Sequence, residues 1–143
     1  MKTGKELKEA LLKTIPVAAG YLVMGFGFGV LLTARGYPFF WAPVMGLIVY
    51  AGSMQFVLID LLSGGAGIIT AAVMTFLINA RHLFYGLSML DEYRRVRRGR
   101  NYLIFSLTDE TFSIVASGLP KPDFDAGRYY LGVSALDQGY WVA

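Results

Sequence analysis

A polar segment in the middle of an apolar stretch holds the residues best suited to chemistry. Within residues 79–88, which read NARHLFYGLS, Arg81 and His82 lie side by side, and the surrounding apolar run extends over residues 67–90. A run of that length is long enough to cross a bilayer. A central arginine costs ~2.5–3.5 kcal/mol at that depth even on a lenient insertion scale. We therefore expect Arg81 and His82 to serve a ligand path or to contact a buried partner.

Two carboxylates are placed to meet this arginine. Arg81 precedes the arginine-rich segment 94–100, and Asp109 and Glu110 follow it. At the rise of an α-helix, Arg81 lies about 15 Å below that segment and the carboxylates about 12 Å below it, so the charges share one depth. Two hypotheses remain open. The pair is either a structural ion pair, or a gate or substrate contact in which Arg81 holds a carboxylate and Asp109 or Glu110 an amine or a proton.

Four further polar groups are candidates for the same path. His82 titrates near neutral pH in water and is either a proton relay or a hydrogen-bonded packing residue. Ser53 and Gln55 lie at a Gly-Ser pair, which is a known kink site, and a half-helix beginning there would favour a carboxylate. Asn79 shares a helix face with His82. The candidate transport path is therefore Ser53, Gln55, Asn79, Arg81, His82, Asp109 and Glu110.

The elements that must position these residues are apolar blocks. The chain is 55% hydrophobic and 16% charged, whereas soluble domains carry about 25% charged residues. The blocks cover residues 15–34, 39–62, 67–90 and 102–119, and a fifth begins near residue 129. They predict an all-α, polytopic membrane bundle in which residues 1–143 form a single transmembrane domain. We also expect residues 4–13 to form a short amphipathic helix at the membrane surface, before Pro16.

The basic residues constrain the topology. Lysines gather in residues 2–13 and arginines in residues 94–100, and the positive-inside rule places both segments in the cytoplasm. Three full membrane crossings between these two basic segments would place them on opposite sides of the membrane. Residues 39–62 are therefore expected either to enter, break at Gly52–Ser53 and return as a re-entrant hairpin, or to form a continuous, kinked span. The predicted location is the inner (plasma) membrane, with multiple passes and a cytoplasmic N-terminus.

The sequence contains no motif typical of several other function classes. The chain has no cysteine and one histidine, so neither a cysteine-based nor a multi-histidine metal site is expected. Neither GxSxG, a Walker loop nor HExxH occurs. The basic segments flank apolar blocks and do not indicate nucleic acid. We predict no catalytic residue, no metal and no cofactor, with the lipid bilayer as one partner.

Five blocks in order resemble the AzlC-like family, the azaleucine-resistance or branched-chain amino acid permeases. They are GYLVMGFGFGVL (20–31), YAGSMQF (50–56), NARHLFYGLS (79–88), LTDETF (107–112) and YWV (140–142). The resemblance implies the large subunit of an exporter of branched-chain amino acids, often paired with a small AzlD-like membrane subunit. It also implies additional C-terminal spans, so the chain is expected to be the N-terminal portion of a longer transporter.

The resulting expectation is a secondary transporter that exports valine, leucine and isoleucine and is not an enzyme. Two alternatives remain. One is a structural membrane subunit. The other is an intramembrane enzyme that uses His82 with Asp109 or Glu110.

Overall fold

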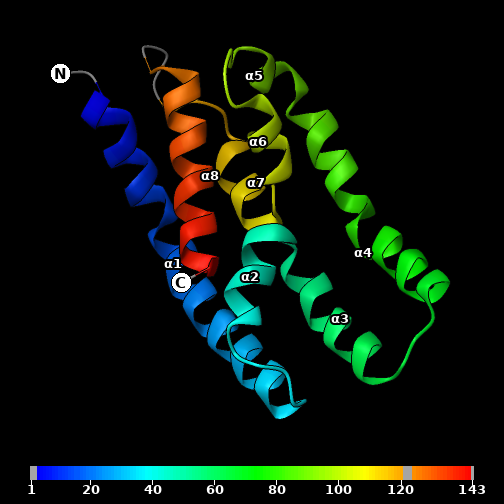
Figure 1. The fold of residues 1–143 in the computed structure, drawn as a ribbon. Coiled ribbons are helices and arrows are strands. Elements are labelled where there is room, and N and C mark those ends of the chain that lie inside the picture. The colour runs from blue at the N-terminus through cyan, green and yellow to red at the C-terminus, as the bar shows by residue number, and fades with distance from the viewer. Residues whose placement is uncertain (1–2, 121–123, 143) are drawn as a thin grey trace.

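The computed structural model describes residues 3–120 and 124–142, and every regular element within them is an α-helix (Figure 1). The helices are α1 (Thr3–Ala34), α2 (Trp41–Ile48), α3 (Gly52–Ser63), α4 (Ile68–Ser88), α5 (Leu90–Arg94), α6 (Arg100–Phe105), α7 (Asp109–Val115) and α8 (Ala126–Val142). The all-α prediction is confirmed.

Two helices, α1 and α4, are long and apolar enough to cross a membrane by length and composition. Their apolar side chains face outward. Phe26 on α1 is 76% exposed, Ile68 on α4 is 89% exposed, and α4 buries none of its residues. A water-soluble monomer rarely exposes apolar surface on this scale. The outward faces therefore suit a lipid environment, as the two apolar blocks 15–34 and 67–90 predicted.

The predicted surface helix at residues 4–13 is not a separate element. α1 continues through Pro16 without a break. The reason lies in α8, which packs along α1 (Figure 1). Ala10 is fully buried in a cluster with Tyr129 and Tyr130 of α8, so this first part of α1 is held against the bundle. Neighbouring helices commonly stabilise a proline within a membrane helix in this way.

Residues 39–62 break into two helices, as the Gly-Ser pair predicted. α2 and α3 are separated by residues 49–51, directly before Gly52–Ser53. At the break Tyr50 adopts a φ of 44°, a left-handed conformation that is unusual for a bulky residue. Its ring is nevertheless buried, packed with Tyr21 of α1 and Trp141 of α8. The surrounding packing therefore holds this strained turn in place.

The two helices form a hairpin and not a continuous, kinked span. Ala42 near the start of α2 and Ile59 near the end of α3 both pack around Leu32, at the end of α1. An ion pair of 3.0 Å between Arg35, directly after α1, and Asp60 also joins the end of α1 to the end of α3. α2 runs toward the middle of the molecule and α3 runs back (Figure 1). Both open ends of the hairpin therefore lie where α1 ends, and its re-entry into the membrane stays a prediction.

A second hairpin replaces the continuous span expected at residues 102–119, and that prediction was wrong. α6 ends at Phe105 and α7 starts at Asp109. The N-cap of α7 is Thr108, whose hydroxyl accepts a hydrogen bond from the Thr111 amide. Such local side-chain bonds compete with a continuous helix and favour a new helix start.

The second hairpin approaches from the opposite end of the bundle. Leu103 of α6 and Val115 of α7 share one buried cluster with Val96, next to α5. The tips of the two hairpins meet, and the rings of Tyr50 and Phe105 have centroids 6.3 Å apart. The middle of the molecule is therefore built from the ends of four short helices.

The arginine-rich segment lies at the same end as the first part of α1. Tyr93 and Val96 belong to the buried cluster that contains Ala10. Arg100 closes the segment, since its guanidinium donates to the carbonyl oxygens of Tyr93, Arg94 and Val96 at 3.0–3.2 Å. This arrangement is the one that the positive-inside argument requires, and the side of the membrane stays a prediction.

The hairpin topology is testable by labelling with a membrane-impermeant thiol reagent, because the chain has no cysteine. We expect Ala34→Cys and Ala66→Cys to be labelled from one side of the membrane and Arg97→Cys from the other. If residues 39–62 formed a continuous span, positions 34 and 66 would instead be labelled from opposite sides of the membrane. Labelling of 34 together with 97, and not with 66, would therefore contradict the hairpin.

Candidate functional site

A cavity of about 190 Å³ lies where the two hairpin tips meet. It is lined by residues of α1, α3, α4, α7 and α8 and by the tip residues between the short helices. The polar lining residues are Tyr21, Tyr50, Ser53, Arg81, His82, Thr108, Asp109 and Glu110. Met24, Phe56 and Trp141 provide apolar surface. Side chains from segments far apart in sequence therefore converge on one small space.

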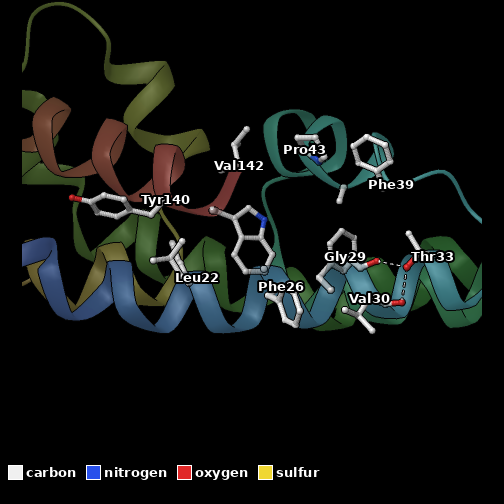
Figure 2. A pocket seen from close by; sticks show the side chains of 14 residues that line it. Leu22, Phe26, Gly29, Val30, Thr33, Phe39, Pro43, Tyr140 and Val142 are labelled. Carbon is white, nitrogen blue, oxygen red and sulfur yellow. Dashed lines mark hydrogen bonds between the residues drawn. The ribbon is translucent and has the colours of Figure 1, made fainter.

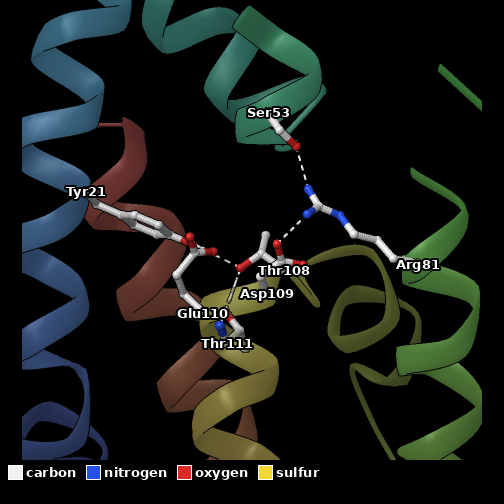
Figure 3. A network of polar contacts seen from close by, with 7 residues as sticks. All are labelled: Tyr21, Ser53, Arg81, Thr108, Asp109, Glu110 and Thr111. Atoms are coloured by element: carbon white, nitrogen blue, oxygen red, sulfur yellow. Dashed lines mark hydrogen bonds and ion pairs between the residues drawn. The ribbon is translucent and has the colours of Figure 1, made fainter. Parts of the chain in front are cut away.

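Arg81 connects the two hairpins across this cavity (Figure 3). One guanidinium nitrogen forms an ion pair of 2.6 Å with Oδ2 of Asp109, at the start of α7. The other terminal nitrogen donates to the hydroxyl of Ser53, at the start of α3. The predicted pairing of Arg81 with a carboxylate of the next segment is confirmed, and its partner is Asp109.

Arg81 and Asp109 do not use all of their hydrogen-bonding atoms within the described structure. Both side chains are half-buried, with 39% of Arg81 and 38% of Asp109 exposed. Within the described structure Nε of Arg81 and Oδ1 of Asp109 are buried and have no hydrogen-bond partner. Polar atoms left without partners at depth are costly and rare. The pair therefore leaves one buried donor nitrogen and one buried acceptor oxygen without a hydrogen bond to the described residues.

Glu110 is held by hydroxyl groups. Tyr21 of α1 donates to Oε2 of Glu110 at 2.9 Å, and the same hydroxyl lies 2.9 Å from Oγ1 of Thr108 (Figure 3). Thr108 is also the cap of α7. One hydroxyl cluster therefore fixes both the start of α7 and the carboxylate next to it.

His82 lines the cavity beside Arg81. Its ring lies 6.0 Å from that of Tyr85, which stacks on Phe112 of α7 at 4.4 Å. This aromatic contact fastens α4 to the second hairpin. A relay role for His82 stays a prediction.

Five of the seven predicted path residues line the cavity, and two do not. Gln55 is fully buried behind it, where its Oε1 accepts from Nε1 of Trp141 at 2.9 Å and from the amide of Ala51 at 3.3 Å. Asn79 does not line the cavity either, and its Oδ1 is buried without a partner within the described structure. Gln55 thus fastens the first hairpin to α8.

Sequence reasoning missed several polar or aromatic residues that the fold brings to this region, among them the following four. Tyr21, Thr108 and Trp141 line the cavity, and Asp137 lies fully buried on α8. A tyrosine or threonine carries little signal in an apolar block. Asp137 did carry a signal, since it is an acidic residue in a segment otherwise suited to a membrane.

A larger hollow of about 660 Å³ runs along α1 beneath α2 and the end of α8 (Figure 2). Its lining is mainly apolar, with Leu22, Phe26 and Val30 along one side. Thr33 turns its hydroxyl to its own helix and donates to the carbonyl oxygens of residues 29 and 30. This hollow therefore suits lipid or another apolar helix better than a charged solute.

The tip cavity has the chemistry to hold a small solute that carries both charges. A cation and two carboxylates face a common space, and apolar groups complete the wall. Among the described residues no group of three or more histidines and carboxylates is placed to hold a metal ion.

Comparison with known proteins identifies the family. The family model described as AzlC protein matches residues 16–143. The chain belongs to the AzlC family. It is 38% identical over 136 residues to the branched-chain amino acid transport protein AzlC of Bacillus subtilis, covering 95% of this chain and 54% of that protein.

Other relatives of the chain are named as membrane proteins. An uncharacterized membrane protein of Helicobacter pylori is 39% identical over 138 residues, covering 96% of this chain and 60% of that protein. The inner membrane protein YgaZ of Escherichia coli is 26% identical over 137 residues, covering 94% and 56%. The chain thus spans about half the length of these relatives. No solved structure matches it significantly.

The Arg81–Asp109 pair predicts non-additive mutational effects. Arg81→Ala leaves a carboxylate unpaired at depth and should lower stability by roughly 1–3 kcal/mol. Removing Asp109 as well should recover part of that loss. Thermal unfolding of the purified single and double variants measures both effects. Strictly additive losses would show that the two residues do not interact.

Gln55→Leu should affect the fold and not the cavity. The change removes the acceptor of Trp141 Nε1, and a buried donor without a partner costs roughly 1–3 kcal/mol. We expect a lower unfolding temperature, with transport per folded molecule unchanged. Normal stability combined with impaired transport would place Gln55 in the transport path after all.

Proposed function

We propose that this AzlC-family chain belongs to a secondary transporter that exports the branched-chain amino acids valine, leucine and isoleucine. The observation that carries the proposal is the tip cavity, in which Arg81 faces Asp109 and Glu110 at the junction of two broken helices. Broken helices at membrane depth are the usual setting of transporter substrate sites.

The charges of the cavity match those of a free amino acid. The α-carboxylate would take donors from Arg81 and Ser53, and the α-ammonium would take acceptors from Asp109 or Glu110. A bidentate contact with a guanidinium is among the stronger carboxylate contacts. Since Arg81 and Asp109 already pair with each other, the substrate would exchange one ion pair for two, and no charge would be left uncompensated.

The apolar part of the wall suits a branched side chain. Met24, Phe56 and Trp141 face the same space. Its volume of about 190 Å³ is below the roughly 300–1,000 Å³ of pockets for drug-sized ligands. A small apolar amino acid fits this description better than a large or highly charged one.

The proposed energy source for transport depends on whether the chain carries a nucleotide-binding motif. The sequence has no Walker loop, so the drive proposed is an ion gradient or the gradient of the substrate itself. The Bacillus subtilis relative is named a branched-chain amino acid transport protein, which supports the substrate class. The enzyme alternative has no such support.

The remaining features of the proposal concern the assembly. We place the chain in the inner membrane with its N-terminus in the cytoplasm, as the N-terminal part of a longer transporter, paired with a small AzlD-like subunit. The Escherichia coli relative is named an inner membrane protein, which supports the location. Co-purification of a tagged chain with its small subunit from detergent extracts tests the pairing.

Ser53→Ala should weaken valine efflux at normal membrane abundance. The change removes one donor-acceptor contact of Arg81, worth ~0.5–1.5 kcal/mol, so efflux should fall roughly 2- to 10-fold. Efflux and membrane abundance are measured in the same cells, with the protein expressed from its native gene.

A matched control is Ser88→Ala. Within the described part of the chain the Ser88 hydroxyl donates to the Phe84 carbonyl of its own helix, and Ser88 does not line the cavity. A purely structural subunit predicts that both serine variants behave alike. Unchanged efflux for Ser53→Ala would remove the support for a substrate site at the hairpin tips.

A further inference from the structure

Asp137 forms a second polar site behind the cavity. It is fully buried on α8, and its Oδ2 accepts a hydrogen bond of 2.8 Å from the hydroxyl of Thr111. Its Oδ1 is buried as well and has no partner within the described structure. No lysine, arginine or histidine of the described residues lies within 4.0 Å of it. The described residues are therefore sufficient to bury this carboxyl group completely.

The surroundings of Asp137 disfavour its ionised form. The titratable groups that interact with it are Tyr50 from the first hairpin tip, Tyr102 from α6 and Glu110 from α7. All of them are neutral or negative, so none compensates a negative charge. A buried carboxylate without a cation is very costly, and such a group neutralises itself by binding a proton.

A row of hydroxyl groups connects Asp137 with the cavity. The Thr111 hydroxyl that donates to Asp137 lies 3.3 Å from that of Thr108. The Thr108 hydroxyl lies 2.9 Å from that of Tyr21, which lies 2.9 Å from Oε2 of Glu110. Figure 3 shows the part of this row from Tyr21 to Thr111. Three of the steps are 2.8–2.9 Å, typical of O–H···O hydrogen bonds, and the Thr108–Thr111 step is a longer 3.3 Å. The row crosses from α1 to α7 to α8.

We propose that Asp137 binds the proton that is coupled to transport and exchanges it with Glu110 through the hydroxyls of Tyr21, Thr108 and Thr111. Protonated Glu110 gives its proton to Tyr21, each hydroxyl passes one proton onward, and ionised Asp137 accepts the last. Glu110 ends ionised and Asp137 neutral, with every hydroxyl restored and no bond changed except O–H bonds. The inference rests on the proposed transport function and names its coupling ion.

The first experiment measures the proton itself. Infrared difference spectra of the purified protein, expressed from its native gene, are recorded between high and low pH. We expect a carbonyl band of a buried carboxylic acid that is lost in Asp137→Asn. Asp91→Asn serves as the control, because that side chain is 94% exposed. A band unchanged by Asp137→Asn, or no such band in the wild-type protein, would overturn the proposal.

The second experiment measures coupling in proteoliposomes. Asn at position 137 has the shape of the neutral acid, so Asp137→Asn should retain valine exchange and lose accumulation driven by a pH gradient. Retained gradient-driven accumulation would contradict the proposal. The infrared measurement needs no transported solute, so it decides the protonation of Asp137 even if valine is not transported.

A pair of variants at position 111 tests the hydroxyl row with Asp137 intact. Thr111→Val removes the hydroxyl and keeps the shape, and it should shift the carbonyl band and abolish gradient-driven accumulation. Thr111→Ser restores the hydroxyl and should restore both. Equal behaviour of the two variants would refute the row, and this comparison remains decisive if Asp137→Asn fails to fold.

Discussion

Both hairpins depend on one constraint, which is that backbone groups freed at a helix break must find partners where water is scarce. Hydrocarbon offers no hydrogen bonds, so a break at membrane depth is tolerated only inside protein or beside a polar cavity. The amide of Ala51, at the first break, donates to Oε1 of Gln55. At the second break the Thr111 amide donates to the side chain of Thr108. Each break is thus completed by a polar side chain within its own hairpin.

The same constraint explains why the two tips face each other. A tip directed at lipid would expose its polar atoms, whereas two tips in contact share one polar space. Trp141 of α8 binds Gln55 behind the first tip and packs against Tyr21 of α1 at a ring distance of 5.3 Å. Arg81 of α4 then joins Ser53 and Asp109 across the gap. The long helices act as a frame, and the cavity is the space that the broken helices leave between them.

The sequence predicted those features that follow from depth and local backbone preference. Arg81 and Asp109 pair because helical rise puts them at one level, and this required no knowledge of the tertiary fold. The first hairpin was one of two alternatives for residues 39–62. It was considered because three full crossings would have put the basic segments 2–13 and 94–100 on opposite sides of the membrane. The break itself lies at residues 49–51, directly before the Gly-Ser pair that signalled it.

The features that sequence reasoning missed depend on contacts between distant segments. Residues 102–119 have an apolar composition that hides the Thr108 cap, so the second break was not predicted. Gln55 was assigned to the cavity because an amide at depth needs a partner, and that partner proved to be Trp141, 86 residues away. An acidic residue in an otherwise apolar segment marked Asp137 as unusual, but its burial and its bond to Thr111 of α7 depend on contacts between distant segments.

The middle of the molecule contains the charged or titratable groups of Arg81, Asp109, Glu110 and Asp137. Arg81 compensates Asp109, and in the proposed transport cycle a zwitterionic solute replacing this pair would add no net charge. Among the described residues Glu110 and Asp137 have no cation within 4.0 Å, and hydroxyls join them. Two negative charges at this depth are unfavourable, so a proton shared between them lowers the cost. The position of that proton changes the charge beside Arg81, and this gives a physical route by which proton binding and solute binding influence each other.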